Sequence, residues 1–505
     1  MAVLSVDAGT TGVTAMIVAE DGGVLARDTQ EFTQHFPDNG WVEHSPDDIW
    51  QATLRAVGAV TQACEAPLSC VGITNQRETV VFWDRETLGA PRRAIVWQDR
   101  RTAARCDSLR DAGHEPRVHR LTGLRLDPYF SASKVEWVRE HDAQTWHGVE
   151  SGRVALGTVD SYLVARMTRG LQHLTDATNA SRTLLLDLAA GTWSAEMCDL
   201  WGVPLAALPE VVPSYGRLAV TEPECFLGLA LPITGIAGDQ QAALFGQTAF
   251  APGQSKCTYG TGSFVLTNTG ATVPLSDAGT GDGADTDSGL LATVAWRSPD
   301  GTDTYALEGS VFVTGSAVQW LRDGLGVITS ASEVEALARS VPDSGGVVFV
   351  PALAGLGAPH WDPFARGLVI GITRGTTSAH LARATLDGIV QSVRDVVDAM
   401  AVAAGVPLRS LAVDGGAAAN DLLCQLQADQ LQVPVLRPTV VETTGLGAAF
   451  LAGLGAGVWS STAELEQTWQ LDRRFEPGTR DDAARRQWTR AVERARDWAR
   501  DDEIG

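Results

Sequence analysis

Two short hairpins, each with glycine at its bend, constrain the fold of this chain more than any other feature. Residues 3–6 form an apolar run, residues 7–12 a polar turn with two glycines, and residues 13–19 a second apolar run. Residues 256–268 repeat this pattern around Gly260, Thr261 and Gly262. Apolar runs separated by such turns predict strand hairpins. Because the hairpins open two stretches of similar length, we expect one domain at residues 1–248 and another at residues 249–505.

Strand patterns alternate with helical patterns along both halves, which is typical of an α/β fold. Residues 46–63 predict a helix that has Ser45 as its N-cap and Pro46 in its first turn. Residues 239–246 predict another helix, and further strands are expected at residues 24–27, 70–73 and 79–83. Residues 481–502 predict a C-terminal helix. Its packing face would carry Trp488, Val492, Ala495 and Trp498.

The charge of the chain limits its partners. Its 505 residues include 39 Lys and Arg against 61 Asp and Glu, a formal net charge of −22, which repels nucleic acid and anionic lipid. We expect neither partner, and no apolar run is long enough to enter a membrane as a span. The seven cysteines form no C-x-x-C pair, which favours a reducing, cytoplasmic location. Lysine occurs only at Lys134 and Lys256, which we interpret as a compositional preference for arginine.

The first hairpin turn is the strongest local signal for chemistry. Thr10 and Thr11 present hydroxyl and backbone N–H groups, and such a nest can hold a phosphate. Asp7, at the end of the first strand, is placed to orient a magnesium ion. The pattern lacks the lysine of a P-loop. An ordinary polar hairpin is the alternative interpretation.

Three further motifs have both a structural and a functional interpretation. In residues 413–420, two glycines lie between a strand and a helix. They either let an anion approach the backbone closely or form a tight turn. Asp239 follows a strand, so it is either a helix N-cap or a carboxylate exposed at a ligand-binding edge. Arg77 and Glu78 are either a surface ion pair or part of a site. The acidic stretch 276–289 lacks EF-hand spacing, and we interpret it as a solvated surface insertion rather than a calcium site.

These motifs occur in one order within a longer series of blocks. The series includes GWVEHSPDDIW, GITNQRET, AIVWQDRRTA, DPYFSASKVEW, TDATNASRTLL, GIAGDQQAALFGQ, TYGTGSFVL, YALEGSVF, GLGAPHWDPFARG and VDGGAAAN. Together they resemble the FGGY family of carbohydrate kinases nearly from end to end, and specifically its members that phosphorylate glycerol. The resemblance implies two actin-like, ribonuclease-H-like α/β domains with a catalytic cleft between them. It also implies ATP, glycerol and Mg²⁺ as ligands, and a homo-oligomer, either a dimer or a tetramer.

The resemblance assigns roles to individual residues. Asp239 would be the general base that accepts the proton of the primary hydroxyl, and Asp7 would lie near the magnesium ion. The glycerol site would consist of Arg77, Glu78, Trp97, Tyr129, Asp239, Gln240 and Phe264, with Trp97 and Phe264 as its walls. The nucleotide site would consist of Thr10, Thr11, Gly12, Thr261, Gly315, Val318, Gln319, Gly416 and Asn420.

The chain departs from the family pattern in its first hairpin. Family members usually have Ser and Arg where this chain has Gly12 and Thr14, so a cation that would face the phosphates is missing. Two alternatives to a glycerol-phosphorylating enzyme stay open. One is another polyol or ketose kinase of the family, and the other is an actin-like ATPase that acts as a regulator.

Overall fold

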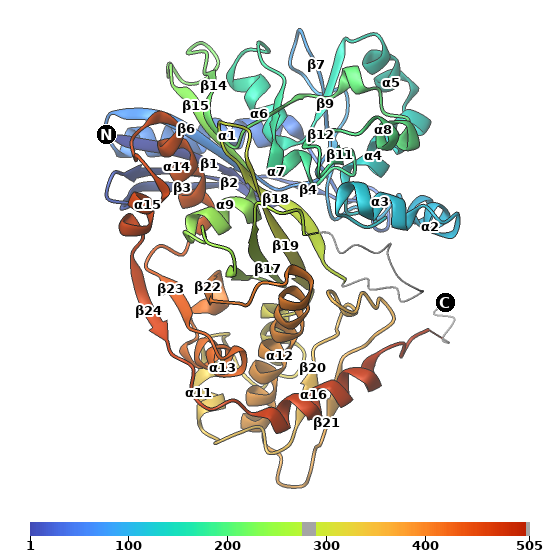
Figure 1. Ribbon diagram of the computed structural model, residues 1–505, viewed down its shortest axis with the longest axis vertical. Coiled ribbons are helices and arrows are strands. Elements are labelled where there is room, and N and C mark those ends of the chain that lie inside the picture. Colours follow the sequence, from blue (N-terminus) through green and yellow to red (C-terminus); the bar gives the residue numbers. More distant parts are fainter. Residues whose placement is uncertain (275–288, 501–505) are drawn as a thin grey trace.

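The computed structural model describes residues 1–274 and 289–500, and it forms two lobes, each built around one mixed β-sheet (Figure 1). The sheet of the first lobe has six strands in the order β14-β15-β6-β1-β2-β3. Their bounds are β1 (Ala2–Ala8), β2 (Gly12–Ala19), β3 (Val24–Glu31), β6 (Leu68–Asn75), β14 (Tyr215–Val220) and β15 (Pro232–Gly238). The central strands β1, β6 and β15 run parallel, so their carboxyl ends share one edge.

Helix α1 (Pro46–Ala63) begins where the sequence predicts, because the Ser45 side chain accepts a hydrogen bond from the backbone N–H of Asp48 at 3.2 Å. Its buried face contributes to the core of the first sheet. The predicted hairpin at residues 3–19 is confirmed by the pairing of β1 with β2.

Smaller elements complete the first lobe and enclose an apolar cluster of their own. The helices are α2 (Ala103–Asp111), α3 (Glu115–Thr122), α4 (Ser131–His141), α5 (Ala143–Glu150), α6 (Val159–Met167), α7 (Ala177–Ala180), α8 (Ala195–Trp201) and η1 (Leu205–Ala207). The strands are β4 (Gln34–His35), β5 (Glu43–His44), β7 (Val81–Asp84), β8 (Ala94–Ile95), β9 (Val154–Gly157), β10 (Leu174–Asp176), β11 (Leu186–Asp187), β12 (Thr192–Trp193) and β13 (Glu210–Val212).

The second lobe contains a seven-stranded sheet in the order β18-β19-β17-β16-β22-β23-β24. Its strands are β16 (Gln254–Tyr259), β17 (Ser263–Gly270), β18 (Leu291–Arg297), β19 (Asp303–Val311), β22 (Ser410–Asp414), β23 (Val435–Pro438) and β24 (Leu471–Phe475). A two-stranded sheet of β20 (Val348–Val350) and β21 (Leu368–Ile370) lies beside it. The remaining helices are α9 (Asp239–Gly246), α10 (Gly315–Asp323), α11 (Glu333–Arg339), α12 (Ser378–Ala404), η2 (Gly416–Ala419), α13 (Asp421–Leu431), α14 (Thr443–Ala456), α15 (Thr462–Thr468) and α16 (Asp482–Ala495).

The predicted boundary at residue 248 falls between α9 and β16, but the two halves of the sequence are not separate in space. Helix α14, from the second half, lies against the sheet of the first lobe (Figure 1). At Gly72 on β6, an added Cβ would lie 2.2 Å from the carbonyl oxygen of Ala448 on α14. Only a residue without a side chain allows the two backbones to approach so closely.

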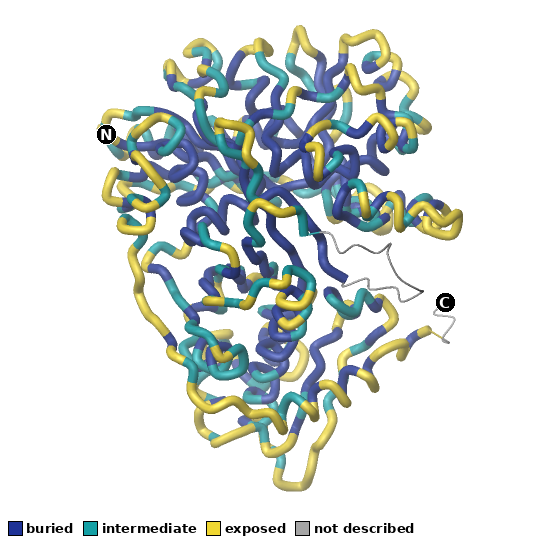
Figure 2. Tube along the Cα trace, in the orientation of Figure 1, coloured by how far each residue is buried: buried dark blue, intermediate teal, exposed yellow. Residues whose placement is uncertain are grey.

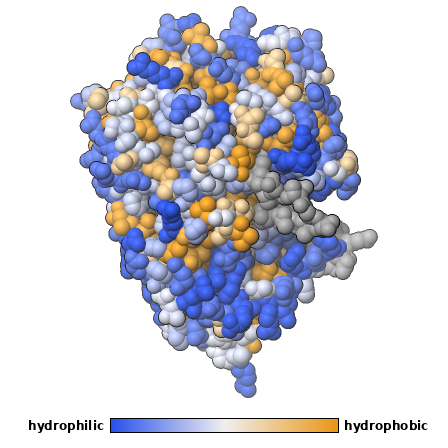
Figure 3. All heavy atoms as spheres, viewed as in Figure 1, coloured by the Kyte–Doolittle hydropathy of each residue, from blue (hydrophilic) through white to orange (hydrophobic). Residues whose placement is uncertain are grey.

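The buried residues are concentrated in the two sheets and in the helices that cover them (Figure 2). On the face drawn in Figure 3, hydrophilic residues predominate and apolar residues lie in small groups among them. Within residues 1–274 and 289–500, no helix combines the length and apolar character that a membrane span requires.

The C-terminal prediction is partly wrong. Trp488, Val492 and Ala495 lie on the buried face of α16, as expected. The helix ends at Ala495, however, and Trp498 lies beyond it with 68% of its surface exposed. The predicted surface insertion at residues 276–289 lies, except for its last residue, outside the described part of the chain.

Candidate active site

Arg77 and Glu78 lie two and three residues after the end of β6, at the carboxyl edge of the first sheet. The interpretation as a surface ion pair is wrong, because the two residues are only 3% and 1% exposed. The nitrogen Nε of Arg77 lies 3.8 Å from Oε1 of Glu78. Buried charges are costly unless they are paired. The pair therefore belongs to a larger charged cluster.

The guanidinium of Arg77 joins several of the residues that the sequence assigns to glycerol. Its Nε lies 3.2 Å from Oδ1 of Asp239, and its Nη2 donates to the hydroxyl of Tyr129 at 3.4 Å. Its Nη1 donates to Oε1 of Gln241 at 3.2 Å and to Oε2 of Glu308 at 2.5 Å. Segments far apart in the sequence thus meet at one side chain.

Asp239 is the first residue of α9, and Gly238 is the N-cap of that helix. The interpretation of Asp239 as the N-cap is therefore wrong. Its carboxylate follows the carboxyl end of β15 and accepts a hydrogen bond from the backbone N–H of Gln240 at 2.7 Å. The side chain is 28% exposed, whereas the other charged groups around Arg77 are almost fully buried. Asp239 is thus the carboxylate in this cluster that a ligand can reach.

Asp7 lies near the carboxyl end of β1, at the same sheet edge as Arg77 and one strand away from it. Its Oδ1 is buried and has no hydrogen-bond partner among the described residues. Burial, and then the negative charge of Asp239, raise the pKa of Asp7 to about 7. A carboxylate oxygen that lacks a protein donor and is subject to the negative charge of a second carboxylate is suited to a hard divalent cation.

Trp97 and Tyr129 form an aromatic corner beside the charged cluster. Their rings are T-shaped, with centroids 5.5 Å apart. The indole N–H of Trp97 donates to the hydroxyl of Thr10 at 3.0 Å, which connects this corner to the first hairpin. Phe264 lies on β17, two residues from Leu266, which pairs with Glu308. Phe264 and Glu308 therefore share one face of the second sheet.

Gly12, which the resemblance assigns to the nucleotide site, is the first residue of β2 in the first hairpin. An added Cβ at Gly12 would lie 2.8 Å from the carbonyl oxygen of Gln30 on β3. Packing of the neighbouring strand therefore requires glycine there. Thr11 is exposed, whereas the hydroxyls of Thr14 and Thr29 lie 3.0 Å apart in a hydrogen bond.

The second hairpin is joined to the start of α10. The carbonyl oxygen of Thr261 accepts hydrogen bonds from the backbone N–H groups of Thr314 and Ser316 at 3.0 and 3.1 Å. The N–H of Gly315 donates to the carbonyl of Gly260 at 3.0 Å. Further along α10, Val318 is buried in the second core, whereas Gln319 is exposed.

The glycines after β22 serve different purposes. Gly415 has a φ of 81°, and an added Cβ would lie 2.5 Å from the carbonyl oxygen of Tyr259. Gly416 is exposed, and no described atom lies within 4 Å of the place where its Cβ would be. Asn420 is the N-cap of α13, since its side chain accepts a hydrogen bond from the N–H of Leu423 at 2.9 Å. Gly416 is thus the glycine of this motif whose conformation leaves space for a ligand.

The sequence motifs do not point to three buried charges around the cluster, namely Arg182, Lys256 and Glu308. The signal for Glu308 was present, because it is the acidic residue in the buried part of strand β19, whose other acidic residue, Asp303, lies at the strand's half-buried start. Both lysines of the chain, Lys134 and Lys256, are buried. The ammonium of Lys134 donates to three backbone carbonyls, and that of Lys256 donates to the side chains of Gln240 and Thr258. Burial lowers the pKa of both lysines.

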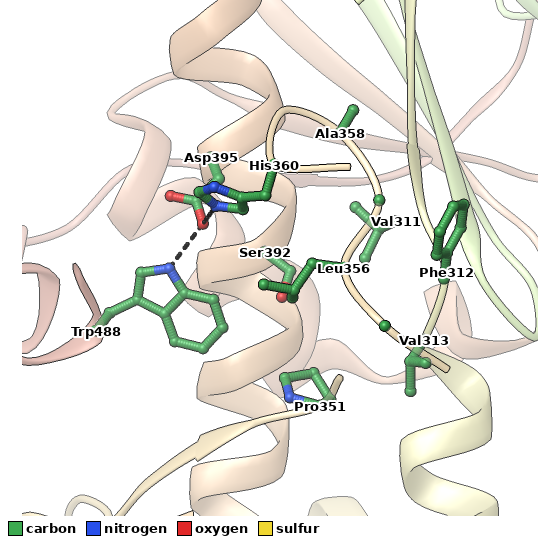
Figure 4. Close-up of a pocket in the computed structure, with 12 residues that line it drawn as sticks. Val311, Phe312, Val313, Pro351, Leu356, Ala358, His360, Ser392, Asp395 and Trp488 are labelled. Atoms are coloured by element: carbon green, nitrogen blue, oxygen red, sulfur yellow. Dashed lines mark hydrogen bonds and ion pairs between the residues drawn. The ribbon is translucent and has the colours of Figure 1, made fainter. Parts of the chain in front are cut away.

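A small pocket in the second lobe lies apart from this cluster (Figure 4). His360, Leu356, Val313 and Ser392 line it, and Trp488 of α16 closes one side. The indole of Trp488 donates to Asp395 of α12 at 2.8 Å, and Arg485 pairs with the same carboxylate at 2.5 Å. Neither the predicted glycerol residues nor the predicted nucleotide residues line this pocket. We interpret it as the seam where α16 packs on α12.

Comparisons with known proteins place this architecture in a family. The chain matches the FGGY family of carbohydrate kinases, N-terminal domain, over residues 2–246, and the C-terminal domain of the same family over residues 255–456. The chain therefore belongs to the FGGY family of carbohydrate kinases. Its two lobes have the actin-like, ribonuclease-H-like fold of that family.

Individual relatives are similar over nearly their whole length. The glycerol kinase of Aromatoleum aromaticum is 51% identical, covering 98% of this chain and 99% of the relative. That of Trichlorobacter lovleyi is 52% identical with the same coverage. A crystal structure of Plasmodium falciparum glycerol kinase with ADP superposes with a TM-score of 0.90 at 32% identity and covers 98% of each chain.

Proposed function

We propose that this protein is a kinase that transfers the γ-phosphoryl group of ATP to glycerol and forms sn-glycerol 3-phosphate. One observation carries the proposal: Arg77 contacts Glu78, Tyr129 and Asp239 within one cluster, in which Asp239 is the accessible carboxylate and Tyr129 is half-buried. A small polyol needs donors and acceptors on several sides together with apolar contact for its carbons. The aromatic corner of Trp97 and Tyr129 supplies that contact. The relatives named glycerol kinase support this choice of substrate.

In this proposal the side chains of the cluster position the substrate and move one proton. Arg77 donates to a hydroxyl of glycerol while Glu78 accepts from another, and Gln240 and Phe264 complete the site. Asp239 accepts the proton of the primary hydroxyl as that oxygen attacks the γ-phosphorus. The contact of Asp239 with Nε of Arg77 holds its carboxylate in one orientation. Positioning of this kind supplies much of the rate enhancement in phosphoryl transfer.

The nucleotide would lie between the two hairpins. Thr10, Thr11 and Gly12 approach it from the first lobe, and Thr261, Gly315, Val318, Gln319, Gly416 and Asn420 approach it from the second. Asp7 and Asp239 are the residues that would hold Mg²⁺, directly or through water, and the orphaned oxygen of Asp7 fits that role. Bound there, the ion would neutralise charge on the transferring phosphates. The predicted cytoplasmic location and the predicted dimer or tetramer stay predictions.

A coupled assay of ADP release tests the proposal and separates it from its alternatives. We expect glycerol to stimulate ADP release far more than erythritol or D-xylulose, with kcat/KM higher by roughly a hundredfold, because the site is built around specific hydroxyls. Preference for a ketose or a tetritol would favour another sugar kinase of the family. ATP turnover that no polyol stimulates would instead favour the actin-like ATPase regulator.

Thr14→Arg tests whether the first hairpin lacks a cation. Thr14 pairs with Asp7 in the register of β1 and β2, so the new guanidinium would start beside the predicted phosphate site. Charge-assisted hydrogen bonds to phosphate are strong, and we expect kcat/KM for ATP to rise about tenfold with little change in the KM for glycerol. We also expect the wild-type enzyme to depend steeply on the Mg²⁺ concentration.

The matched control is Thr14→Gln, which also loses the hydrogen bond with Thr29 but adds no charge. This variant should not raise kcat/KM for ATP. If Thr14→Arg abolishes ATP turnover in a folded protein, another cation already occupies this place and our interpretation of the hairpin is wrong.

A further inference from the structure

Glu308 reaches the glycerol-binding cluster from the other lobe. It lies on β19, in the second sheet, and its side chain is fully buried. Oε2 of its carboxylate accepts from Nη1 of Arg77 at 2.5 Å, and Oε1 accepts from Nη2 at 3.2 Å. The carboxylate thus binds the guanidinium end-on, through both terminal nitrogens. Such a bidentate pair fixes the plane of the guanidinium as well as its position.

Arg182, which follows α7, completes a closed set of charges. Its Nε donates to Oε1 of Glu78 at 2.7 Å, and its Nη2 donates to Oε1 of Glu308 at 2.9 Å. Its guanidinium carbon lies 5.3 Å from the ring centre of Phe130 and 5.7 Å from that of Tyr129. Two cations and two anions therefore alternate around the cluster. Burial alone would raise the pKa of Glu308, but Arg182 and Arg77 hold it at about 2, so the carboxylate stays charged.

The five N–H groups of Arg77 show how this arrangement orients the guanidinium. Glu308 and Gln241 occupy both hydrogens of Nη1 and one hydrogen of Nη2. The second hydrogen of Nη2 and the hydrogen of Nε lie on one edge of the planar guanidinium. That edge faces Tyr129, at 3.4 Å, and Asp239, at 3.2 Å. The Nε–Nη2 edge of Arg77 is therefore directed toward Tyr129 and Asp239, two of the residues predicted to bind glycerol.

We propose that Glu308 and Arg182 are positioning residues that determine which hydroxyl pattern the site accepts. Glu308 turns Arg77 so that its Nε–Nη2 edge faces the substrate, and Arg182 holds the carboxylate of Glu78 against the same ring of charges. The inference rests on the proposed function, because it concerns the site to which that function assigns glycerol. It also implies that the polyol site depends on a side chain from the second lobe.

Glu308→Gln is the main test. The amide keeps the shape but accepts fewer hydrogen bonds and loses the charge, so Arg77 is free to rotate. We expect the KM for glycerol to rise at least tenfold, the KM for ATP to stay within twofold, and the preference for glycerol over propane-1,2-diol to fall at least fivefold. Circular dichroism and thermal melting report whether the variant is folded.

Arg182→Lys is the second variant, and it tests the inference if Glu308→Gln does not fold. It leaves the net charge of the cluster unchanged. A lysine cannot bond Glu78 and Glu308 with the same fixed geometry. We expect the same loss of preference for glycerol over propane-1,2-diol. The matched control is Asp160→Asn, another fully buried carboxylate, which accepts hydrogen bonds from Thr158 and Thr175. It should shift the melting temperature and leave the preference unchanged.

The outcomes separate this inference from the proposed function. If the wild-type protein phosphorylates glycerol and the folded variants keep its KM and its preference, Glu308 and Arg182 are structural only and the inference is overturned. If the wild-type protein releases no ADP in response to glycerol, the proposed function fails and the inference fails with it. A shift of KM and preference in the variants, without one in Asp160→Asn, supports the inference.

Discussion

Replacing Asp239 by asparagine is expected to reduce kcat for glycerol by about a hundredfold or more, the scale of a lost general base. Asparagine keeps the shape of the side chain, and its amide oxygen can still accept from Nε of Arg77 and from the backbone N–H of Gln240. Glycerol should therefore still bind, while the proton of its primary hydroxyl has no acceptor. Steady-state kinetics combined with calorimetric titration of glycerol measure the two effects separately.

The control for Asp239→Asn is Asp300→Asn, which changes an exposed carboxylate in the turn between β18 and β19. That variant should have the kinetics of the wild type. Near-normal kcat in folded Asp239→Asn would remove Asp239 from the mechanism and leave the transfer without the proposed base.

Replacing Asp7 by asparagine is expected to abolish most activity and, at pH 8, to stabilise the fold. The pKa of Asp7 is about 7 in the folded chain, against 3.8 as the ordinary value. The folded state therefore holds a proton that the unfolded state releases as the pH rises from 4 to 7, and stability falls over that window. Asparagine carries no such proton. The free energy of unfolding that Asp7→Asn gains over the wild type should therefore grow across the same pH window. It should level off above pH 7, at roughly 1–3 kcal/mol for one unpartnered buried group.

Thermal melting between pH 5 and pH 8.5 measures this difference. Asp84→Asn is the control with the opposite sign. The backbone N–H of Thr87 and then the side chain of Arg153 lower the pKa of Asp84 to about 2. That carboxylate stabilises the fold above pH 4, so its loss should lower the melting temperature at pH 8. Magnesium should raise the melting temperature of the wild-type protein and leave that of Asp7→Asn unchanged. A destabilised Asp7→Asn at pH 8 would contradict the burial of an unpaired charge.

Local patterns predicted the elements well where one residue type has one structural meaning. Ser45 followed by Pro46 located the start of α1, and the glycine turns located both hairpins. Trp498 was assigned to a helix face because the apolar period continues past residue 495, whereas the helix ends there. Periodicity alone does not reveal where a helix stops.

The site was harder to predict from the sequence, because the role of its residues depends on whether segments distant in the sequence bury them. Arg77 and Glu78 look the same in a sequence whether they are solvated or enclosed. Distant residues make them a paired cluster: Glu308, 231 positions away from Arg77, and Arg182, 104 positions away from Glu78. The same holds for Lys256. The sequence shows that lysine is rare in this chain, but it does not show that Lys256 contacts Gln240.

The return of α14 to the first lobe affects how this protein can be divided and assembled. A fragment that ends at residue 248 would lack α14, and the tightly packed surface around Gly72 would face water instead of Ala448. A protein cut there would have to rejoin its pieces before the first lobe was complete. A nascent chain, likewise, cannot finish its first lobe until residue 456 has left the ribosome.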